Sequence, residues 1–576
     1  MIAFLTANIA PLMFGAMVLL LLLGYPVAFS LAACGVIFGL VGIELNLLPA
    51  TLFQAMPDRI WGVMSNDTML AIPFFTFMGL ILERSGMAED LLDTIGQLFG
   101  PIRGGLAFAV IFVGAMLAAT TGVVAASVIS MGLISLPIML RYGYDKRLAS
   151  GVIAASGTLA QIIPPSLVLI VMADQLGRSV GDMYKGAFVP GLVLTGLYTL
   201  YVIGVTIVRP KWAPALPAEA RTIREDNGDV GLRSLFVLVA VAVAAALAFM
   251  NTALPAAIMS AMRRDVVEHV ALDEAIVIGM CVWALVAYVC AQANSSFKLG
   301  LLSRMAERFT FVLIPPLALI FLVLGTIFLG VATPTEGGAM GASGALFMAL
   351  ARKRLSLAQL RQAMESTARL TTFVVFILIG SRVFSLTFYG VDGHLWVEHL
   401  LVNMPGGHLG FLIFVNVLIF VLAFFLDFFE LSFIVVPLLA PVAEKLGIDL
   451  VWFGVLLGIN MQTSFMHPPF GFALFYLRSV APRAIRTTDI YWGAVPFVLI
   501  QIIMVCLVIA FPQLVNVGLD KTQEVDVDKV EINIQDDSQP AEVPSELAGS
   551  APAAEESAPA SDAGNDDIMK SFGSAK

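Results

Sequence analysis

The sequence has 576 residues, of which 59% are hydrophobic and only 13% are charged, and its mean hydropathy is +0.92. Soluble domains are typically about 25% charged, so this composition excludes a soluble globular protein and predicts a polytopic protein of the lipid bilayer. The net charge of −10 is local, because residues 520–576 hold 14 acidic residues and 4 lysines, whereas the preceding 519 residues hold 28 acidic and 28 basic ones. The acidity therefore gives no reason to expect an acidic substrate, and no nucleic-acid partner is expected.

Apolar stretches long enough to cross a bilayer, which takes about 20 residues, recur along the chain. They lie at 9–23, 27–44, 68–83, 105–140, 148–176, 188–208, 232–252, 274–292, 311–330, 336–351, 368–389, 409–442, 451–477 and 491–512. Four are interrupted: 105–140 by "ATTGVV", 409–442 by "LDFFE", and 148–176 and 451–477 by a double proline each. The N-terminus, "MIAFLTANIA", has no basic region and no convincing cleavage site, so the first helix is predicted to be retained. The four cysteines show no metal-ligand spacing and are predicted to pack.

These interruptions repeat at an offset of 304 residues. The offset pairs Pro137 with Pro441, Gly143 with Gly447, Asp145 with Asp449, Pro164 with Pro468, and Pro165 with Pro469. It also places "TTGVV" opposite "LDFFE", and "LLLGYPVAFSLAACGVIFGL" resembles "FLGVATPTEGGAMGASGALF" at nearly the same offset. Agreement in order and spacing over some 160 residues predicts an internal duplication.

The basic residues predict the orientation of the two halves, because cytoplasmic loops are rich in Lys and Arg. Clusters lie at 141–147, 209–224, 298–308, 352–361 and 478–486. With these in the cytoplasm, segment 105–140 begins and ends on that side and is predicted to be a re-entrant hairpin. Segment 409–442 is flanked by His408 and by Glu444, Lys445 and Asp449, with no basic excess. It is predicted to be a hairpin from the outside, so the halves are inverted and both termini are extracytoplasmic. Arg263 and Arg264 are the exception, because they fall in an outside loop.

The predicted fold class is therefore an all-α polytopic membrane protein with an inverted repeat, two re-entrant hairpins and two Pro-broken helices. Its predicted segments are 1–208, the first repeat, with hairpin 105–140 and broken helix 148–176; 209–308, a linker with extra helices at 232–252 and 274–292; 309–512, the second repeat, with hairpin 409–442 and broken helix 451–477; and 513–576, an acidic tail. The tail is rich in Ala, Pro, Ser and acidic residues and is predicted to be disordered.

The double prolines indicate a binding site. Broken helices persist in lipid only where they are buried in protein or line a cavity, and transporters use the exposed carbonyls for cations and the half-helix N-termini for anions. Each break follows a hairpin interruption, at Thr121 and Asp427, so the tips and the breaks are predicted to meet near mid-membrane. A pair of tolerated proline kinks is the alternative interpretation.

Polar residues gather near these breaks in the sequence. They are Thr120, Thr121, Gly122, Ser127, Ser156, Thr158, Gln161 and Ser166 in the first half, and Asp427, Glu430, Ser432, Asn460, Gln462, Thr463, Ser464 and His467 in the second. Neutral oxygen ligands suit Na⁺, which is a hard cation. A carboxylate in mid-hairpin is by default a functional hypothesis, with a paired structural acid as the alternative for Asp427. His467 could equally make a helix-end hydrogen bond, and Glu336 could be a capping residue.

Four motifs carry a family resemblance. "GYDKRLASGVIAASGTLAQIIPPS", "GVATPTEGGAMGASGAL", "LDFFELSFIVVPLLAPV" and "TSFMHPPFGFALFYLRSVAP" resemble the large membrane subunit of TRAP (tripartite ATP-independent periplasmic) transporters. The resemblance implies a bacterial inner-membrane protein with an elevator-type fold that the wider ion-transporter superfamily shares. It implies Na⁺-coupled uptake of organic acids, with a small four-helix membrane subunit and a periplasmic substrate-binding protein as partners.

The sequence departs from the family pattern at the first hairpin. Val123 and Val124 stand where many members have serines, so cation ligation there would fall to Thr120, Thr121 and backbone oxygens. The final motif and the central insert resemble the mannitol/chloroaromatic compound subgroup, which leaves both 2-oxo acids (monocarboxylates) and C4-dicarboxylates as substrates. Because the chain starts with the large subunit's first helix, the small subunit is expected to be a separate polypeptide.

Together these patterns predict a site with no catalytic residue and no organic cofactor. The predicted substrate-binding residues are Thr121, Gln161, Ser166, Thr463, Ser464 and His467. No arginine falls clearly at mid-membrane, and Arg382 is the closest candidate, with a paired scaffold residue as the alternative interpretation. The predicted Na⁺ ligands are Thr120, Thr121, Gly122, Ser156, Pro164, Asp427, Glu430, Asn460 and Thr463. Proton coupling, or an ion channel or antiporter on the same scaffold, are the alternatives. An intramembrane enzyme is not expected because its usual motifs are absent, as is a Walker A sequence.

Overall fold

The computed structural model describes residues 2–519 except 221–222, 224–230, 264–271, 403, 470 and 518. Within these residues the regular elements are helices, and no β-strand is present. Nine described helices are long and apolar enough to cross a membrane, or up to eleven if each of two bent helix pairs is one span. The prediction of an all-α polytopic membrane protein is therefore confirmed.

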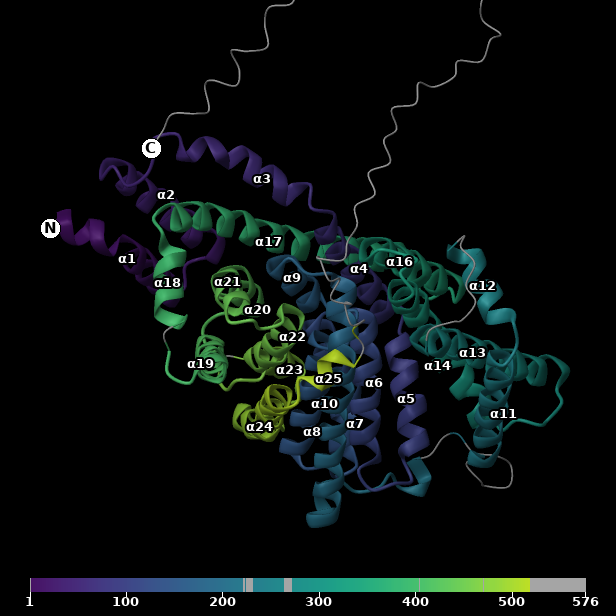
Figure 1. Ribbon diagram of the computed structural model, residues 1–576. Coiled ribbons are helices and arrows are strands. Elements are labelled where there is room, and N and C mark those ends of the chain that lie inside the picture. Colours follow the sequence, from purple (N-terminus) through teal and green to yellow (C-terminus); the bar gives the residue numbers. More distant parts are fainter. Residues whose placement is uncertain are drawn as a thin grey trace, which may run out of the picture. The chain divides into compact units, whose positions relative to one another are not determined.

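Helices of the first half run from the N-terminus to the linker (Figure 1). They are α1 (Ile2–Leu22), α2 (Val27–Glu44), α3 (Met56–Met64), α4 (Ala71–Arg84), α5 (Met87–Phe99), α6 (Gly105–Thr121), α7 (Val124–Arg141), α8 (Lys146–Thr158), α9 (Leu167–Leu176) and α10 (Val180–Val208). The insert holds α11 (Leu232–Met250), α12 (Leu254–Arg263) and α13 (Leu272–Phe297). In this insert α11 and α13 pack on each other and on α14 (Arg304–Ile320).

The second half begins with α14 and repeats the order of the first. Its further helices are α15 (Thr326–Phe328), α16 (Pro334–Ala351), α17 (Leu357–Gly390), α18 (Gly393–Val402), α19 (Gly407–Leu422), α20 (Phe428–Glu430), α21 (Val436–Lys445), α22 (Leu450–Met461), α23 (Phe472–Val480) and α24 (Thr487–Ala510). Adding 304 to the bounds of α7 gives 428–445, which is the start of α20 and the end of α21. The two halves differ at α3 and α4, which meet at a 44° bend, because their counterpart is the single helix α17.

Packing partners are exchanged between the halves (Figure 1). Helix α2 lies along α17, and α16, the counterpart of α2, lies along α4. Glycines bring the backbones of α2 and α17 together, since a Cβ added at Gly35 would lie 2.7 Å from the carbonyl oxygen of Val383, and one at Gly380 would lie 2.5 Å from that of Ala28. Small residues allow such close approach between membrane helices. Each half therefore supplies the surface that covers the other.

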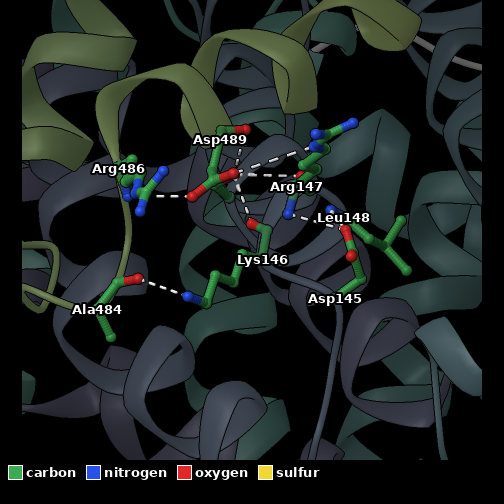
Figure 2. A network of polar contacts seen from close by, with 8 residues as sticks. Asp145, Lys146, Arg147, Leu148, Ala484, Arg486 and Asp489 are labelled. Atoms are coloured by element: carbon green, nitrogen blue, oxygen red, sulfur yellow. Dashed lines mark hydrogen bonds and ion pairs between the residues drawn. The ribbon is translucent and has the colours of Figure 1, made fainter.

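Helices α8 and α24 form a third long contact, and Figure 2 shows the polar network at their N-terminal ends. Lys146 donates from Nζ to the carbonyl oxygen of Ala484 at 2.7 Å, and Arg147 lies 4.0 Å from the carboxylate of Asp489. Further along, a Cβ added at Gly493 would lie 2.2 Å from the carbonyl oxygen of Arg147. This junction therefore joins the first half to the second through backbone contact and polar bonds.

The repeated residues of the sequence shape equivalent turns. Gly143 and Gly447 have positive φ angles of 82° and 70°, a conformation that glycine adopts without steric cost. Two residues later, Asp145 accepts hydrogen bonds from the backbone N–H groups at the start of α8, and Asp449 does the same for α22. Aspartate is a strongly preferred helix N-cap, so the matched Gly and Asp residues start matched helices.

The structure adds elements that hydropathy does not reveal. Helices α3, α5, α12 and α18 are short or have one apolar face, and α5 buries Met87, Leu91 and Ile95.

The tail predicted to be disordered from residue 513 also begins differently, because α25 (Gln513–Asn516) packs on α10 with Val515 fully buried. Residues 513–519, QLVNVGL, are too few to form a further apolar span, so hydropathy does not reveal this short helix. The tail beyond residue 519 lies outside the described residues.

The linker after α10 crosses the base of the α6–α7 pair. Ala213 accepts a hydrogen bond from the N–H of Gly104 at 3.0 Å, and Trp212 accepts one from the N–H of Asp145 at 2.9 Å. These two donors precede α6 and follow α7, so the linker ties both ends of this pair together.

Candidate functional site

The first hairpin, α6–α7, turns at Gly122 and Val123. Gly122 has φ of +58° and ends α6, and Val123 is extended and starts α7. A Cβ added at Gly122 would lie 3.3 Å from the carbonyl oxygen of Pro165. The tip of the first hairpin therefore rests against the double proline that was predicted to lie beside it.

The first broken helix is interrupted between Ile162 and Ser166. A 3₁₀ turn at Leu159–Gln161 ends its first part, and α9 begins after Ser166. Ser166 accepts from the N–H of Leu169 at 3.4 Å and donates to the carbonyl oxygen of Gln161, so its hydroxyl caps α9 and bridges the break. The Pro164–Pro165 peptide bond in this break is cis, as is Pro468–Pro469 in the second broken helix.

The second hairpin, α19–α21, turns just before Asp427. Asp427 accepts from the N–H of Glu430 at 2.9 Å, and Glu430 accepts from the N–H of Asp427 at 2.9 Å. This reciprocal pair is a capping box, and it starts a helical segment that continues through a π-turn at Leu431–Val435 into α21. Both carboxylates therefore start a helix at the tip, as well as bringing charge to it.

The second broken helix follows the same plan as the first. A 3₁₀ turn at Gln462–Phe465 ends its first part, and α23 begins at Phe472. Phe470, between them, lies outside the described residues. The two interruptions thus sit at matched positions in matched helices.

One cavity of about 280 Å³ joins these four parts. Its lining residues are Gly122, Val123, Val124, Ala125, Gln161, Leu167, Val168, Leu370, Phe373, Asp427, Phe428, Phe429, Phe465, Phe472 and Tyr476. Both hairpin tips and both broken helices are represented, and α17 adds one wall. We call this space the central cavity.

Four helices begin at the wall of the central cavity. Their first residues, Val124, Leu167, Phe428 and Phe472, all line it. A helix N-terminus carries a partial positive charge and free N–H groups, which favour anions. The C-terminal ends of α6 and of the two 3₁₀ turns reach the same space at Gly122, Gln161 and Phe465. The cavity can therefore offer N–H groups to an anion and carbonyl oxygens to a cation.

Asp427 is the charged residue among the described residues that line the central cavity. Gln161 adds a polar group, because its amide oxygen is buried and has no hydrogen-bond partner among the described residues. In the described part of the chain, no three His, Cys, Asp or Glu side chains gather as a metal site. A cation in this cavity would be held by one carboxylate together with amide and carbonyl oxygens.

Of the predicted site residues, Gly122, Gln161 and Asp427 line the central cavity. The side chains of Thr120 and Thr121 lie outside the described part of the chain, and Pro164 is buried in the first break. The remaining hydroxyl and amide groups turn to the backbone: Ser156 donates to Ile153 at 3.0 Å, Thr463 to Asn460 at 2.6 Å, Ser464 to Met461 at 2.7 Å, and Asn460 to Asn416 at 2.8 Å. None of these four side chains is among the lining residues.

Other predicted residues also lie away from the central cavity. The imidazole of His467 packs between the rings of Phe420 and Phe424, at centroid distances of 4.3 and 4.2 Å. Glu430 lines a separate cavity of about 460 Å³ beside the α1–α2 turn. Glu336 forms a capping box with Thr333 at the start of α16, and Arg382 is not a lining residue.

Sequence reasoning missed the aromatic part of the wall. Phe373, Phe429, Phe465, Phe472 and Tyr476 line the central cavity, and Phe373 meets Phe429 edge to face at 6.2 Å. In a chain with 40 phenylalanines, no local signal separates these rings from ordinary lipid-facing ones.

Comparison with known families decides the identity. Residues 14–514 match the family described as "Tripartite ATP-independent periplasmic transporter, DctM component". The chain belongs to this family. It is therefore a transporter permease and not an enzyme, and the resemblance that the motifs predicted is confirmed.

Three curated relatives show how the DctM-family match extends along the chain. The C4-dicarboxylate TRAP transporter large permease protein DctM of Pseudomonas aeruginosa is 26% identical over 80% of this chain and 88% of its own. The protein of the same name in Rhodobacter capsulatus is 25% identical, over 87% and 97%. The 2,3-diketo-L-gulonate TRAP transporter large permease protein YiaN of Escherichia coli is 23% identical, over 86% and 96%. A solved structure of the Alcanivorax borkumensis YdaH transporter matches with a TM-score of 0.46 at 17% identity, over 81% of this chain and 91% of that one.

Proposed function

We propose that this permease imports organic acid anions across the bacterial inner membrane, with the central cavity as the substrate site and Na⁺ as the coupling ion. The hairpins and broken helices, together with α24, which packs on α8, carry the anion as one unit, in an elevator-type movement against the remaining helices. The observation that carries the proposal is the meeting of four helix N-termini and one carboxylate around a single cavity.

The helix N-termini at the central cavity provide the binding groups for the anion. A carboxylate in the central cavity can accept hydrogen bonds from the first N–H groups of α7, α9, α20 and α23, which all begin there. Such half-helix ends hold anionic substrates at membrane depth in transporters. A volume of about 280 Å³ is near the lower limit of small-molecule pockets, which suits a small organic acid.

Asp427 provides the reason to expect a bound cation beside the substrate. An anion beside this carboxylate is repelled, and the repulsion is strong where water is excluded. A Na⁺ ion bound between them offsets it, so substrate and ion stabilise each other and travel together. Carbonyl and amide oxygens near Gln161 and Gly122 complete a ligand set of the kind that hard cations prefer.

Helix packing supports movement as a unit. The helices α2, α4, α16 and α17 pack chiefly on one another, and α7, α8, α23 and α24 form another closely packed group. We propose that the first group belongs to the scaffold and the second to the moving unit. The contact between Phe373 of α17 and Phe429 of the second tip lies where these groups meet.

The family name and the names of relatives support the proposed substrates and partners. The family is tripartite and periplasmic, and the relatives are called large permease proteins, so we propose a small four-helix membrane subunit and a periplasmic binding protein as partners. The relatives are named for C4-dicarboxylates and 2,3-diketo-L-gulonate, which supports succinate-like and 2-oxo acid substrates. The basic clusters of the sequence support periplasmic termini.

Uptake into proteoliposomes tests the proposal. The permease is reconstituted with its small subunit, the binding protein is added outside, and labelled succinate and pyruvate are offered with a Na⁺ gradient, a proton gradient or neither. Asp427→Asn is the informative variant, because Asn is as good an N-cap as Asp and only the charge is lost. Glu430→Gln is the matched control, because Gln also serves in a capping box and Glu430 faces a different cavity.

We expect Na⁺-driven uptake that falls at least about tenfold in Asp427→Asn and stays within about twofold of wild type in Glu430→Gln. Uptake driven by the proton gradient alone would show that the coupling ion is H⁺ and not Na⁺. An ion current without anion uptake would identify a channel and overturn the proposal. Equal uptake by Asp427→Asn and wild type would remove Asp427 from the site.

A further inference from the structure

A second hollow adjoins the central cavity. It is a groove of about 500 Å³ whose lining residues are Arg84, Gln362, Glu365, Ser366, Arg369, Leu370 and Phe373. Arg84 is the last residue of α4, and the other lining residues belong to α17. Leu370 and Phe373 line both hollows, so these two side chains form the partition between the groove and the central cavity.

Two guanidinium groups face this groove. Arg84 donates from Nη1 to the amide oxygen of Gln362, and Gln359 donates to the carbonyl oxygen of Arg84 at 3.1 Å, so α17 fixes the position of Arg84. The Nε atom of Arg84 is buried without a hydrogen-bond partner among the described residues. Arg369 is exposed and forms no ion pair with a described residue.

The acidic residue of the groove does not neutralise these arginines. Glu365 pairs with Arg361 at 2.9 Å, one helical turn away on α17. Arg361 itself is not a lining residue. Glu83, next to Arg84 on α4, also interacts electrostatically with Arg84 but does not line the groove. The lining itself therefore has a net positive charge, and Arg369 offers a free N–H fork of the kind that binds carboxylates by two parallel hydrogen bonds.

We propose that this groove is a second binding site for the transported organic anion, an antechamber in which Arg84 and Arg369 hold its carboxylate next to the central cavity. This inference rests on the proposed function, because the ligand of the groove is the anion that the permease is proposed to transport. The basic cluster at 352–361 precedes Arg369 by about two helical turns. The groove therefore lies toward the face predicted to be cytoplasmic, where an imported anion leaves.

The partition gives the antechamber a gate. Phe373 contacts Phe429, which belongs to the second hairpin tip, edge to face at 6.2 Å. Movement of that tip relative to α17 separates these rings and joins the two hollows.

Charge-selective labelling tests the antechamber without relying on transport. Ser366→Cys places a thiol in the groove of the full chain, after the four native cysteines have been replaced. In inside-out vesicles the rates of modification by an anionic and a cationic methanethiosulfonate are compared. Arg369→Gln removes one charge from the groove, and Arg483→Gln, at an exposed arginine between α23 and α24, removes the same charge outside it.

We expect the anionic reagent to react faster, and the anionic-to-cationic rate ratio to fall roughly three- to tenfold in Arg369→Gln and to stay unchanged in Arg483→Gln. Succinate or pyruvate should slow labelling by both reagents, and less so in Arg369→Gln. An unchanged anionic-to-cationic rate ratio in Arg369→Gln, with normal uptake by the wild-type permease, would overturn the antechamber and leave the proposed function standing.

Two further outcomes separate the alternatives. Slower labelling in bilayers that contain phosphatidylglycerol than in bilayers of phosphatidylcholine, with no protection by succinate or pyruvate, would assign the arginines to lipid headgroups and overturn the inference. Absence of uptake of both acids by the complete system would overturn the proposed function, and with it the transported anion as the ligand of the groove.

Discussion

Gln462 donates a hydrogen bond from Nε2 to the hydroxyl oxygen of Thr158 at 3.2 Å, and the two residues are 304 positions apart in the sequence. This separation is the offset that relates the two halves of the chain. Thr158 and Gln462 are therefore counterparts, one from each repeat, and they touch each other at the ends of α8 and α22. Both are fully buried, so the halves meet at equivalent residues inside the protein.

This contact predicts a coupling between the two positions. Thr158→Val leaves the Gln462 amide buried without its partner, which costs about 1–3 kcal/mol, whereas replacing both partners by apolar residues is nearly neutral. We expect Thr158→Val to lower the melting temperature in detergent and Thr158→Val with Gln462→Leu to recover part of the loss. Strictly additive effects of the two substitutions would show that the hydrogen bond contributes nothing.

A second prediction concerns the first hairpin tip. Gly122→Ala forces a side chain into a left-handed conformation, at about 1–2 kcal/mol, and places its Cβ 3.3 Å from the Pro165 carbonyl oxygen. We expect a lower melting temperature and a loss of most uptake. Gly177→Ala is the matched control, because φ is +61° there and no atom lies within 4 Å of the added Cβ. Gly177→Ala should lower the melting temperature but leave uptake at the wild-type level. Equal uptake by Gly122→Ala and Gly177→Ala would count against a role of the first hairpin tip in transport.

A third prediction separates packing from charge at the α8–α24 junction of Figure 2. Gly493→Ala would place a Cβ 2.2 Å from the carbonyl oxygen of Arg147, so the helices must move apart, and overpacking of this kind typically costs about 1–3 kcal/mol. Arg147→Gln removes a 4.0 Å ion pair whose arginine side chain is 54% exposed, which is worth at most about 1 kcal/mol. We expect the glycine variant to give the lower melting temperature and yield. The reverse order would show that charge, and not close backbone contact, holds the junction.

A fourth prediction concerns Gln161. Its amide oxygen is buried beside the central cavity without a partner among the described residues, and such a group lowers stability. Gln161→Leu should therefore keep or raise the melting temperature while it reduces uptake of succinate or pyruvate at least about tenfold. Uptake at the wild-type level would remove Gln161 from the site, and a lower melting temperature would show that the amide has a structural partner.

The repeat could be predicted from the sequence because its signals are local. Gly143 and Asp145 make the same turn and cap as Gly447 and Asp449, and such residues have the same effect wherever they occur. Helix α5 was not predicted, because half of its surface is polar and its apolar face becomes visible only when it packs.

The site was harder to predict residue by residue. Hydroxyl groups on helices can bond to the carbonyl oxygen three or four residues back, and Ser156, Thr463 and Ser464 do so. Whether such a group serves a ligand or its own helix cannot be read from its position in the chain. Leu370 and Phe373 reach the cavity from α17, which is distant in sequence from both broken helices, and only the tertiary structure brings them there.

The exchange of partners between the halves also determines when the protein can fold. Helices α2 and α4 pack on α17 and α16, which emerge about 300 residues later. At about 5–20 residues per second, synthesis takes roughly 15–60 s to supply them. During that time the glycine-lined faces of the first half have no protein partner, so the nascent chain depends on lipid or an insertase to keep them apart from other helices. Neither half is an autonomous folding unit, and the two made as separate polypeptides would have to assemble in the membrane to fold.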